Sequence, residues 1–298
     1  MKRRYPNAYI IGAQKSGTTS LFNWIGQHPD VYANLSAKDF PFFTDEEIFK
    51  NRLRDFQNIF QNAGSKKIIL GGDANLMYVP GAVERMFLLI PNTKLIAILR
   101  NPVTRAFSAW RFTVERGIEK RTFYEAILSE LKGDIFPPDS RKGRQMNYLD
   151  HGLYSKQLKR IYSCYSKEGV MVLIYEEVIK DPLKNLKEIF QFLGITDLFI
   201  PDFTKENVTL GGQRSKLVSY FLYRRRAHNN PFWELIRLII PKNVRTKLRL
   251  SLQKYNRIPL PPPPFPEDVK SLLKDFYSDE VKELETLLCR KLDIWKDN

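Results

Sequence analysis

The chain has 298 residues, of which 43% are hydrophobic, and its formal net charge is +15. This apolar content is enough for a packed core and excludes an intrinsically disordered chain. The length suits one large α/β domain spanning 1–298. The two cysteines, Cys164 and Cys289, form no C-x-x-C pair. A disulfide framework and a zinc site are therefore not expected, and a reducing cytoplasm is the default location.

The excess of basic residues admits three explanations: nucleic-acid binding, contact with a membrane or polyanion surface, and a site for an anionic cofactor. A secretory signal is not expected. The basic residues at 1–4 precede an apolar run of only about four residues, against the 7–15 that a signal peptide needs. No stretch approaches the roughly 18 apolar residues of a membrane-spanning helix.

The first predicted elements are a strand over 8–11, a tight loop, and a helix whose apolar spacing begins at Leu21. Because a loop that enters a helix N-terminus offers free N–H groups and the positive end of a dipole, it suits a phosphate. Glycine on both sides lets the backbone close around the anion. Six consecutive residues fit such a cradle: Gln14, Lys15, Ser16, Gly17, Thr18 and Thr19. The alternative is an ordinary strand–turn–helix with chance glycines.

The loop differs from an ATP-binding P-loop in the place of its lysine. Gly12 and Gly17 have the spacing of G-x-x-x-x-G-K-[ST], but the lysine stands inside the loop, at Lys15. A lysine after the second glycine reaches the β- and γ-phosphates of a nucleotide. One inside the loop lies closer to a single 5′-phosphate and its bridging oxygen.

At these residues the sequence resembles the sulfotransferases that use 3′-phosphoadenosine-5′-phosphosulfate (PAPS). Their G-x-x-K-S/G-G-T-T/S loop binds the 5′-phosphosulfate of the donor. The subgroup in question includes the heparan-sulfate sulfotransferases and bacterial small-molecule sulfotransferases. The resemblance implies that the residues from Gln14 to Thr19 bind the donor, and that Lys15 neutralises the bridging oxygen as adenosine 3′,5′-bisphosphate leaves.

The next motif is the aromatic stretch 40–43, which follows the charged pair Lys38-Asp39 and contains a proline. It predicts a loop or an edge strand, and a hydrophobic plug with solvated charges would explain it without a catalytic role. The corresponding motif of the heparan-sulfate group is K-E-x-H-F-F, in which the glutamate is the base. The resemblance implies that Asp39 accepts the acceptor's proton. Pro41 stands where that group has histidine.

A second carboxylate follows the predicted buried strand 67–70. Asp73 lies just beyond its end, and active residues of open α/β sheets lie beyond the carboxyl ends of strands. The family often has glutamate here, followed by a tyrosine that Tyr78 matches, although the family's lysine and proline are missing. Two roles for Asp73 are equally supported: it could be the catalytic base, or it could hydrogen-bond within the loop. A surface helix is predicted between the two carboxylates, over 46–62.

The strand predicted over 94–99 is a continuous apolar run, as in a buried parallel strand, and it ends at Arg100. Asn101 is a good N-cap and Pro102 a good first helical residue, so a helix begins here. The family signature R-[DN]-P-x-x-R-x-x-S binds the donor's 3′-phosphate, and the resemblance assigns that role to Arg100 and Ser108. An arginine that caps a strand end is the alternative.

Later segments complete the predicted sheet. His151 precedes a helix that matches the family's G-x-Y motif; it is a third candidate for the base, although a structural role is favoured. Another buried strand is predicted over 170–175, followed by a helix that ends at Gly194. Strands that alternate with helices predict an α/β fold with a P-loop-like, doubly wound parallel sheet of about four to five strands.

The C-terminal third predicts a cofactor-closing loop and a lid over 205–265. Arg214, in a glycine-containing loop, matches a late family loop that closes over the donor. The segment 216–257 holds eleven Lys/Arg and one acid, mixed with apolar residues. It is interpreted as a helical acceptor-side lid, with a membrane or polyanion contact as the alternative. Two C-terminal helices over 267–289 and a final tryptophan, Trp295, resemble the end of the family's chains.

These observations predict a cytoplasmic sulfotransferase that uses PAPS and needs no metal. The expected acceptor is a small secondary metabolite with a hydroxyl, amine or guanidine group, since the histidine typical of the heparan-sulfate group is absent. No nucleic-acid partner and no membrane span are expected. Two rivals remain at this stage: a P-loop kinase or NTPase, which a Mg²⁺ requirement would identify, and a basic polyanion-binding protein, whose binding would depend strongly on salt.

Overall fold

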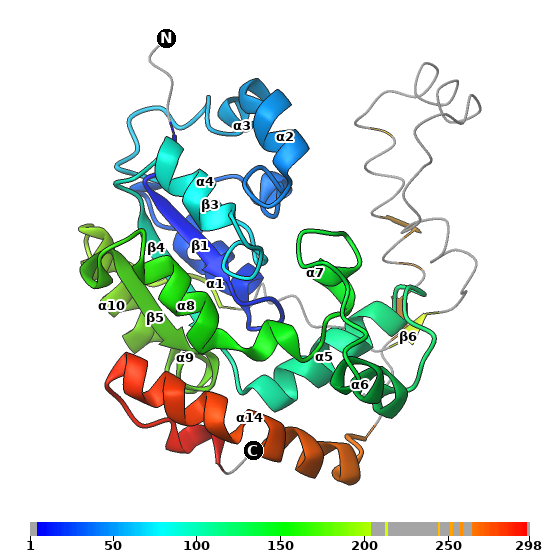
Figure 1. Cartoon of the computed structure of the whole chain (residues 1–298). Coiled ribbons are helices and arrows are strands. Elements are labelled where there is room, and N and C mark those ends of the chain that lie inside the picture. The colour runs from blue at the N-terminus through cyan, green and yellow to red at the C-terminus, as the bar shows by residue number, and fades with distance from the viewer. Residues whose placement is uncertain are drawn as a thin grey trace, which may run out of the picture.

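The computed structural model describes residues 5–203, 212–213, 244, 251–252, 255, 257–258 and 264–296. Its centre is a five-stranded parallel sheet in the order β2-β3-β1-β4-β5 (Figure 1). The strands are β1 Ala8–Gly12, β2 Val31–Ala33, β3 Ile68–Gly72, β4 Lys94–Leu99 and β5 Val170–Ile174. The chain builds one side of the sheet first and then crosses β1 to add β4 and β5. The doubly wound α/β prediction is confirmed.

Helices cover both faces of this sheet. The longer ones are α1 Thr18–Gly26, α4 Ala82–Leu89, α5 Pro102–Val114, α6 Phe123–Leu131, α8 Tyr154–Tyr162, α10 Pro182–Leu193 and α14 Glu267–Leu288. The shorter ones are α2 Glu46–Asn51, α3 Leu53–Ile59, α7 Gly143–Met146 and α9 Tyr175–Lys180, with 3-10 turns η1 Leu35–Ala37, η2 Asp150–Gly152, η3 Lys167–Gly169 and η4 Asp293–Trp295. A two-residue antiparallel pair joins β6 Gly212–Gln213 to β7 Arg257–Ile258.

The alternation of side chains along β1 divides the core in two. Tyr9 and Ile11 belong to the cluster that contains residues of α4 and α8. Ala8 and Ile10 belong to the cluster with α1 and α10. All four side chains are buried, as expected for a central parallel strand covered on both faces.

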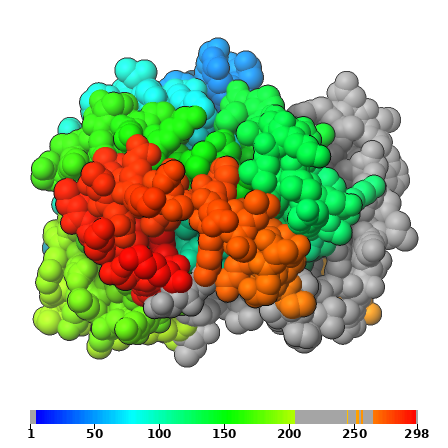
Figure 2. All heavy atoms as spheres, turned by 60° about the horizontal axis from the view of Figure 1, so that its bottom comes forward, coloured from blue at the N-terminus to red at the C-terminus, as the bar shows by residue number. Residues whose placement is uncertain are grey.

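A third hydrophobic cluster lies beyond the sheet, between α5, α6 and α14. Figure 2 shows α14 and the C-terminal residues lying across one face of the molecule. Asn101 caps α5 as predicted: its side chain accepts a hydrogen bond from the Val103 N–H, and Pro102 is the first helical residue. In the part of the chain that the structure describes, no helix has both the length and the apolar character needed to cross a membrane.

Two helix predictions were wrong in detail. The helix predicted over 46–62 is two short ones, α2 and α3, separated at Arg52, whose backbone (φ −124°, ψ 31°) is not helical. The two helices predicted over 267–289 are the single helix α14. The apparent cap at 278–280 fails because Asp279 pairs with Lys282 within the helix, while the Glu280 carboxylate accepts hydrogen bonds from Ser155.

Arg214, most of the predicted donor-closing loop around it, and almost all of the predicted lid over 216–257 lie outside the residues that the structure describes.

Candidate active site

The carboxyl ends of three neighbouring strands bring the predicted site residues to one edge of the sheet. β1, β3 and β4 end at Gly12, Gly72 and Leu99, and the loops that follow are joined by hydrogen bonds. The Asp73 N–H donates to the Ile10 carbonyl at 3.0 Å, and the Ala13 N–H donates to the Ile98 carbonyl at 2.8 Å. The order of the strands reverses at β1, which is where open α/β sheets place their ligands.

The predicted phosphate loop has the backbone features of an anion-binding loop. Gly17 is the N-cap of α1 and has a left-handed backbone (φ 82°, ψ 12°). Among the residues that the structure describes, no side chain caps α1 and no acidic residue lies in its first turn. The positive end of the helix is therefore left for a ligand. A β-carbon at Gly17 would lie 2.9 Å from the ring of Tyr175, so the loop and this ring are in close contact.

Lys15 extends from this loop toward α5. Its ammonium lies 4.1 Å from the centre of the Phe112 ring, and the guanidinium of Arg116 lies 3.5 Å from the same centre. Burial, together with the positive charge of Arg116, lowers the pKa of Lys15 to about 8. A partly desolvated cation among other cations is poised to gain from an anionic ligand.

Arg100 lies between the phosphate loop and β5. Its Nη1 donates to the Lys15 carbonyl at 3.4 Å, its Nε donates to Thr104 Oγ1 at 3.1 Å, and its guanidinium lies 5.0 Å from the centre of the Tyr175 ring. Ser108 lies on α5, which begins directly after Arg100, and its side chain is partly exposed. Arg100 thus lies beside the loop, while the structure gives Ser108 a partly exposed position on the helix that follows it.

Asp39 is held against the same loop by Lys38. The Lys38 ammonium donates to both carboxylate oxygens of Asp39, at 2.9 and 3.0 Å, and to Thr18 Oγ1 at 3.4 Å. The backbone of Asp39 is fixed as well, since its N–H donates to the Gly72 carbonyl at 2.8 Å. The candidate base and the candidate donor loop therefore share one cation.

The backbones of Lys15 and Asp39 are unusual. Among residues other than glycine in the described part of the chain, positive φ is found at Lys15 (68°), Asp39 (62°) and Cys289 (53°). Left-handed backbone at residues with a side chain is uncommon and tends to gather at functional sites. Two of these three positions are the residues predicted to carry the chemistry.

Asp73 lies deeper than Asp39. It is buried, and its carboxylate accepts hydrogen bonds from the Thr44 hydroxyl at 2.7 Å and from the Asn75 N–H at 2.9 Å. Burial, together with the negative charge of Asp39, raises the pKa of Asp73 to about 6. Asp39 also has hydrogen-bonded oxygens, but its side chain is 48% exposed whereas Asp73 is only 2% exposed, so the geometry favours Asp39 as the group that meets an acceptor.

His151 lies in the interior rather than at the mouth of the site. Its ring stacks on Tyr78 with the centres 3.5 Å apart, and it is buried. Burial and the positive charge of Arg105 hold the pKa of His151 well below its usual range. This position fits the structural role that the sequence favoured. Gln14 also faces inward, where it donates to the Arg144 carbonyl at 2.8 Å and to Asn75 Oδ1 at 3.3 Å.

Sequence reasoning assigned no role at the site to Tyr175, Phe112 or Arg116. A signal existed for each. Tyr175 directly follows a strand that ends at the same edge of the sheet as Arg100. Phe112 and Arg116 follow Ser108 at steps of four residues, a spacing that places side chains on one face of a helix.

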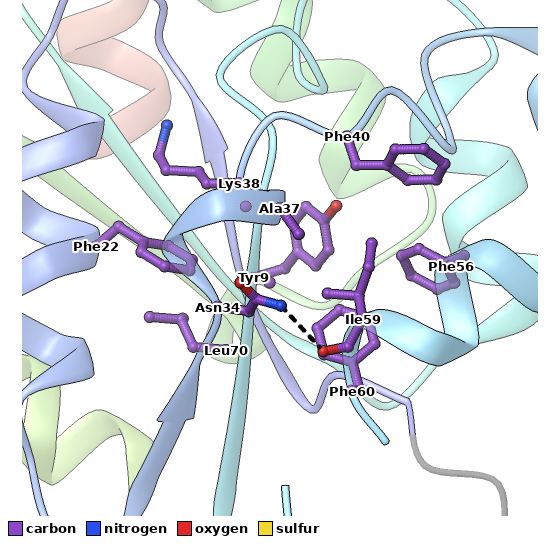
Figure 3. A pocket seen from close by; sticks show the side chains of 12 residues that line it. Tyr9, Phe22, Asn34, Ala37, Lys38, Phe40, Phe56, Ile59, Phe60 and Leu70 are labelled. Atoms are coloured by element: carbon purple, nitrogen blue, oxygen red, sulfur yellow. Dashed lines mark hydrogen bonds between the residues drawn. The ribbon is translucent and has the colours of Figure 1, made fainter. Parts of the chain in front are cut away.

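An apolar pocket lies beside the Asp39 loop (Figure 3). Its walls include the aromatic side chains of Tyr9, Phe22, Phe40, Phe56 and Phe60. Figure 3 shows the Lys38 stem at the rim of this pocket, with the ammonium pointing away from the rings. The aromatic wall therefore buries the aliphatic part of the Lys38 side chain, while the ammonium lies among the polar groups of the site.

Fold and site together define an α/β protein with a loop suited to an anion at the edge of its sheet, and comparison with known proteins identifies its family. The profile of the sulfotransferase domain matches residues 6–209. The chain therefore belongs to the sulfotransferase family. This assignment confirms the resemblance seen in the sequence and favours sulfotransfer over the kinase and polyanion-binding alternatives.

Two curated relatives and one solved structure illustrate the similarity. The mouse bifunctional heparan sulfate N-deacetylase/N-sulfotransferase 4 is 26% identical over 295 residues. The human bifunctional heparan sulfate N-deacetylase/N-sulfotransferase 1 is 27% identical over 296 residues. Each match covers 96% of this chain but only 30% of the relative's length. The crystal structure of a sulfotransferase from Alicyclobacillus acidocaldarius has the same fold, with a TM-score of 0.67, 24% identity, and coverage of 98% of this chain and 99% of that one.

Proposed function

We propose that this sulfotransferase moves the sulfuryl group of PAPS to a hydroxyl or nitrogen of a small-molecule acceptor. One observation carries the proposal: the cradle from Gly12 to Thr19 lies within reach of Arg100 on one side and of Asp39 on the other, linked through the Lys15 carbonyl and the Thr18 hydroxyl. This arrangement supplies a place for each charged end of the donor and a carboxylate beside its reactive end.

The donor contacts follow from the chemistry of each group. The backbone N–H groups at the start of α1, with Ser16, Thr18 and Thr19, suit the 5′-phosphosulfate. Arg100 and Ser108 suit the 3′-phosphate, because a guanidinium binds phosphate through two parallel hydrogen bonds. Arg214 is proposed as a further phosphate contact.

In the reaction, the acceptor oxygen or nitrogen attacks sulfur in line with the bridging oxygen. A new bond to sulfur forms as the bond between sulfur and the bridging oxygen breaks, and the electron pair stays on that oxygen. Asp39 accepts the acceptor's proton. Lys15 stabilises the bridging oxygen as its negative charge develops, and a lysine with a pKa of about 8 can also donate a proton to it. Positioning and charge stabilisation thus supply the catalysis.

The donor site is tested by calorimetric titration with adenosine 3′,5′-bisphosphate, with and without EDTA. We expect binding that EDTA does not weaken. Arg100→Ala should lower the affinity roughly tenfold or more, since each hydrogen bond to a charged group contributes about 1.5–3 kcal/mol. Arg52→Ala, which removes an exposed arginine paired with Asp55, is the control and should bind like the wild type. Tighter binding of ATP–Mg²⁺ than of the bisphosphate would refute the proposal.

The base is tested by Asp39→Asn, which keeps the shape and removes the proton acceptor. We expect kcat to fall by about 10²- to 10⁴-fold, the usual contribution of general-base catalysis, with bisphosphate affinity near that of the wild type. Asp73→Asn and His151→Gln are the comparison variants. Full turnover in Asp39→Asn would move the role to one of those two residues.

The acceptor class is proposed from Pro41, which stands where the heparan-sulfate group has histidine. This proposal is tested with a panel of acceptors: phenols, alkyl alcohols, amines and a de-N-acetylated heparosan oligosaccharide. Turnover is measured by release of the bisphosphate. We expect turnover with small acceptors. Turnover of the oligosaccharide alone would make the chain a polysaccharide sulfotransferase, in keeping with the names of its curated relatives.

A further inference from the structure

The Lys38 side chain is buried, yet its charge serves two parts of the site at once. Only 3% of the side chain is exposed, whereas 48% of the Asp39 side chain is. The ammonium has three hydrogen-bond partners: the two carboxylate oxygens of Asp39 and the hydroxyl of Thr18 in the donor loop. An ammonium can donate three hydrogen bonds, so its capacity is filled.

Both partners of this ammonium are rigidly placed. Asp39 is anchored by its N–H to the Gly72 carbonyl at 2.8 Å and by the Ala74 N–H, which donates to Oδ1 at 3.0 Å. The Lys38 stem passes Gly72 so closely that a β-carbon there would lie 3.6 Å from its Cγ. Thr18 is the first residue of α1, in the turn where an anion would bind. The ammonium therefore lies at the junction between the proposed donor site and the proposed base.

We propose that Lys38 is a positioning residue for which Asp39 and the donor's sulfuryl group compete, an inference that rests on the proposed function. Without donor, the ammonium neutralises Asp39 and occupies both of its oxygens. When sulfuryl oxygens arrive beside Thr18, the ammonium turns to them and releases at least one oxygen of Asp39. That oxygen then has a free lone pair for the acceptor's proton.

The electrostatics favour such an exchange. A buried ammonium needs an anionic or polar partner, and an oxygen of the sulfuryl group can replace one from the carboxylate without leaving the charge unpaired. The carboxylate is half exposed, so water can solvate the oxygen that is given up. The base is thus free to accept a proton only when the donor is in place.

The experiment measures binding without acceptor, with two probes that differ by the sulfuryl group: PAPS and adenosine 3′,5′-bisphosphate. Calorimetry is applied to the wild type, Asp39→Asn, Lys38→Met and the double variant. Asp39→Asn, at a half-exposed position, should tighten PAPS binding about two- to fivefold, the range that a half-exposed ion pair carries. Its bisphosphate affinity should not change. Lys38→Met should weaken PAPS binding by more than it weakens bisphosphate binding.

The double variant and a control pair separate competition for Lys38 from a general charge effect. If the effect of Asp39→Asn acts through Lys38, it disappears in the Lys38→Met background. Asp279→Asn and Lys282→Met alter an exposed pair at the same 2.9 Å separation on α14, and they should leave both affinities unchanged. If the role of Lys38 were purely structural, Lys38→Met would change the affinities for PAPS and for the bisphosphate equally.

Two failures can be told apart. If the wild type binds neither probe, the proposed donor site is wrong. If it binds both, but Asp39→Asn does not tighten PAPS binding, or tightens it equally in the Lys38→Met background, the donor site stands and the competition for Lys38 is refuted.

Discussion

Lys15 illustrates how a few neighbours set the chemistry of one residue. Its ammonium packs on the ring of Phe112, and the Arg116 guanidinium packs on the same ring. Burial, together with the positive charge of Arg116, lowers the pKa of Lys15 to about 8. An ordinary lysine with a pKa near 10.4 would stay charged across the physiological range. Here the charge is present below about pH 8 and is lost above it.

This pKa leads to a prediction about proton uptake. An anion beside Lys15 favours the charged form and raises its pKa, so adenosine 3′,5′-bisphosphate should bind with uptake of a proton at pH 8.5. The affinity should weaken as the pH rises through about 8. Calorimetry in two buffers of different ionisation enthalpy measures the uptake directly. Lys15→Met should abolish most of it; uptake that persists in this variant would assign the titration to another group.

At the scale of elements, the site depends on contacts between the ends of strands and the starts of helices. Gly17 begins α1, Tyr175 begins α9 directly after β5, and Arg100 lies between β4 and α5. The ring of Tyr175 touches both the Gly17 backbone and the Arg100 guanidinium. The loop proposed to bind the 5′ end of the donor and the arginine proposed to bind its 3′ end are therefore held together by one aromatic side chain.

Gly17→Ala tests this packing. The backbone there has φ 82°, and a β-carbon would lie 2.9 Å from the Tyr175 ring. We expect a loss of stability of about 1–3 kcal/mol from backbone strain and a marked loss of bisphosphate affinity. Gly133→Ala is a matched control, because it has φ 88° and no atom within 4 Å of the added carbon. It should lose stability and keep its affinity. Equal affinities in the two variants would contradict the contact.

At the scale of the whole molecule, the C-terminal segment is hydrogen-bonded to residues next to the proposed donor site. The indole N–H of Trp295 donates to Glu176 Oε2 at 2.8 Å, while the Asn101 N–H donates to Oε1 of the same carboxylate at 3.0 Å. The Asn101 side chain in turn donates to the Trp295 carbonyl at 3.0 Å. Residues nearly two hundred positions apart thus meet at the N-terminus of α5, next to Arg100.

Trp295→Phe should remove one hydrogen bond to a partly buried carboxylate and lower the free energy of unfolding by about 1.5–3 kcal/mol. Urea denaturation followed by circular dichroism measures this loss. Trp110→Phe offers a comparison, since its indole donates to a neutral carbonyl, that of Arg121, at 3.1 Å. Trp110→Phe should lower the free energy of unfolding by less, about 0.5–1.5 kcal/mol for the lost hydrogen bond. An unchanged urea midpoint for Trp295→Phe would show that the C-terminal contact contributes nothing.

Local sequence was enough for the parallel sheet and for the strand, loop and helix that form the predicted phosphate loop, because both depend on short-range pattern. Buried parallel strands are continuous apolar runs, and a glycine-rich turn before a helix N-terminus is a local pattern that suits an anion. The N-cap at Asn101 and the helix end at Gly194 are equally local, and both are as predicted.

Only the tertiary structure decided which candidates meet. The resemblance already pointed to Asp39 as the base and left two roles open for Asp73; the tertiary structure adds that Asp73 is enclosed and accepts hydrogen bonds from Thr44 and Asn75. The single helix α14 escaped prediction for the same reason, since Glu280 reads as a helix start until Ser155, far away in the sequence, engages it. The contact between Ser155 and Glu280 joins segments 125 residues apart, and local sequence cannot reveal it because it forms only when the elements pack.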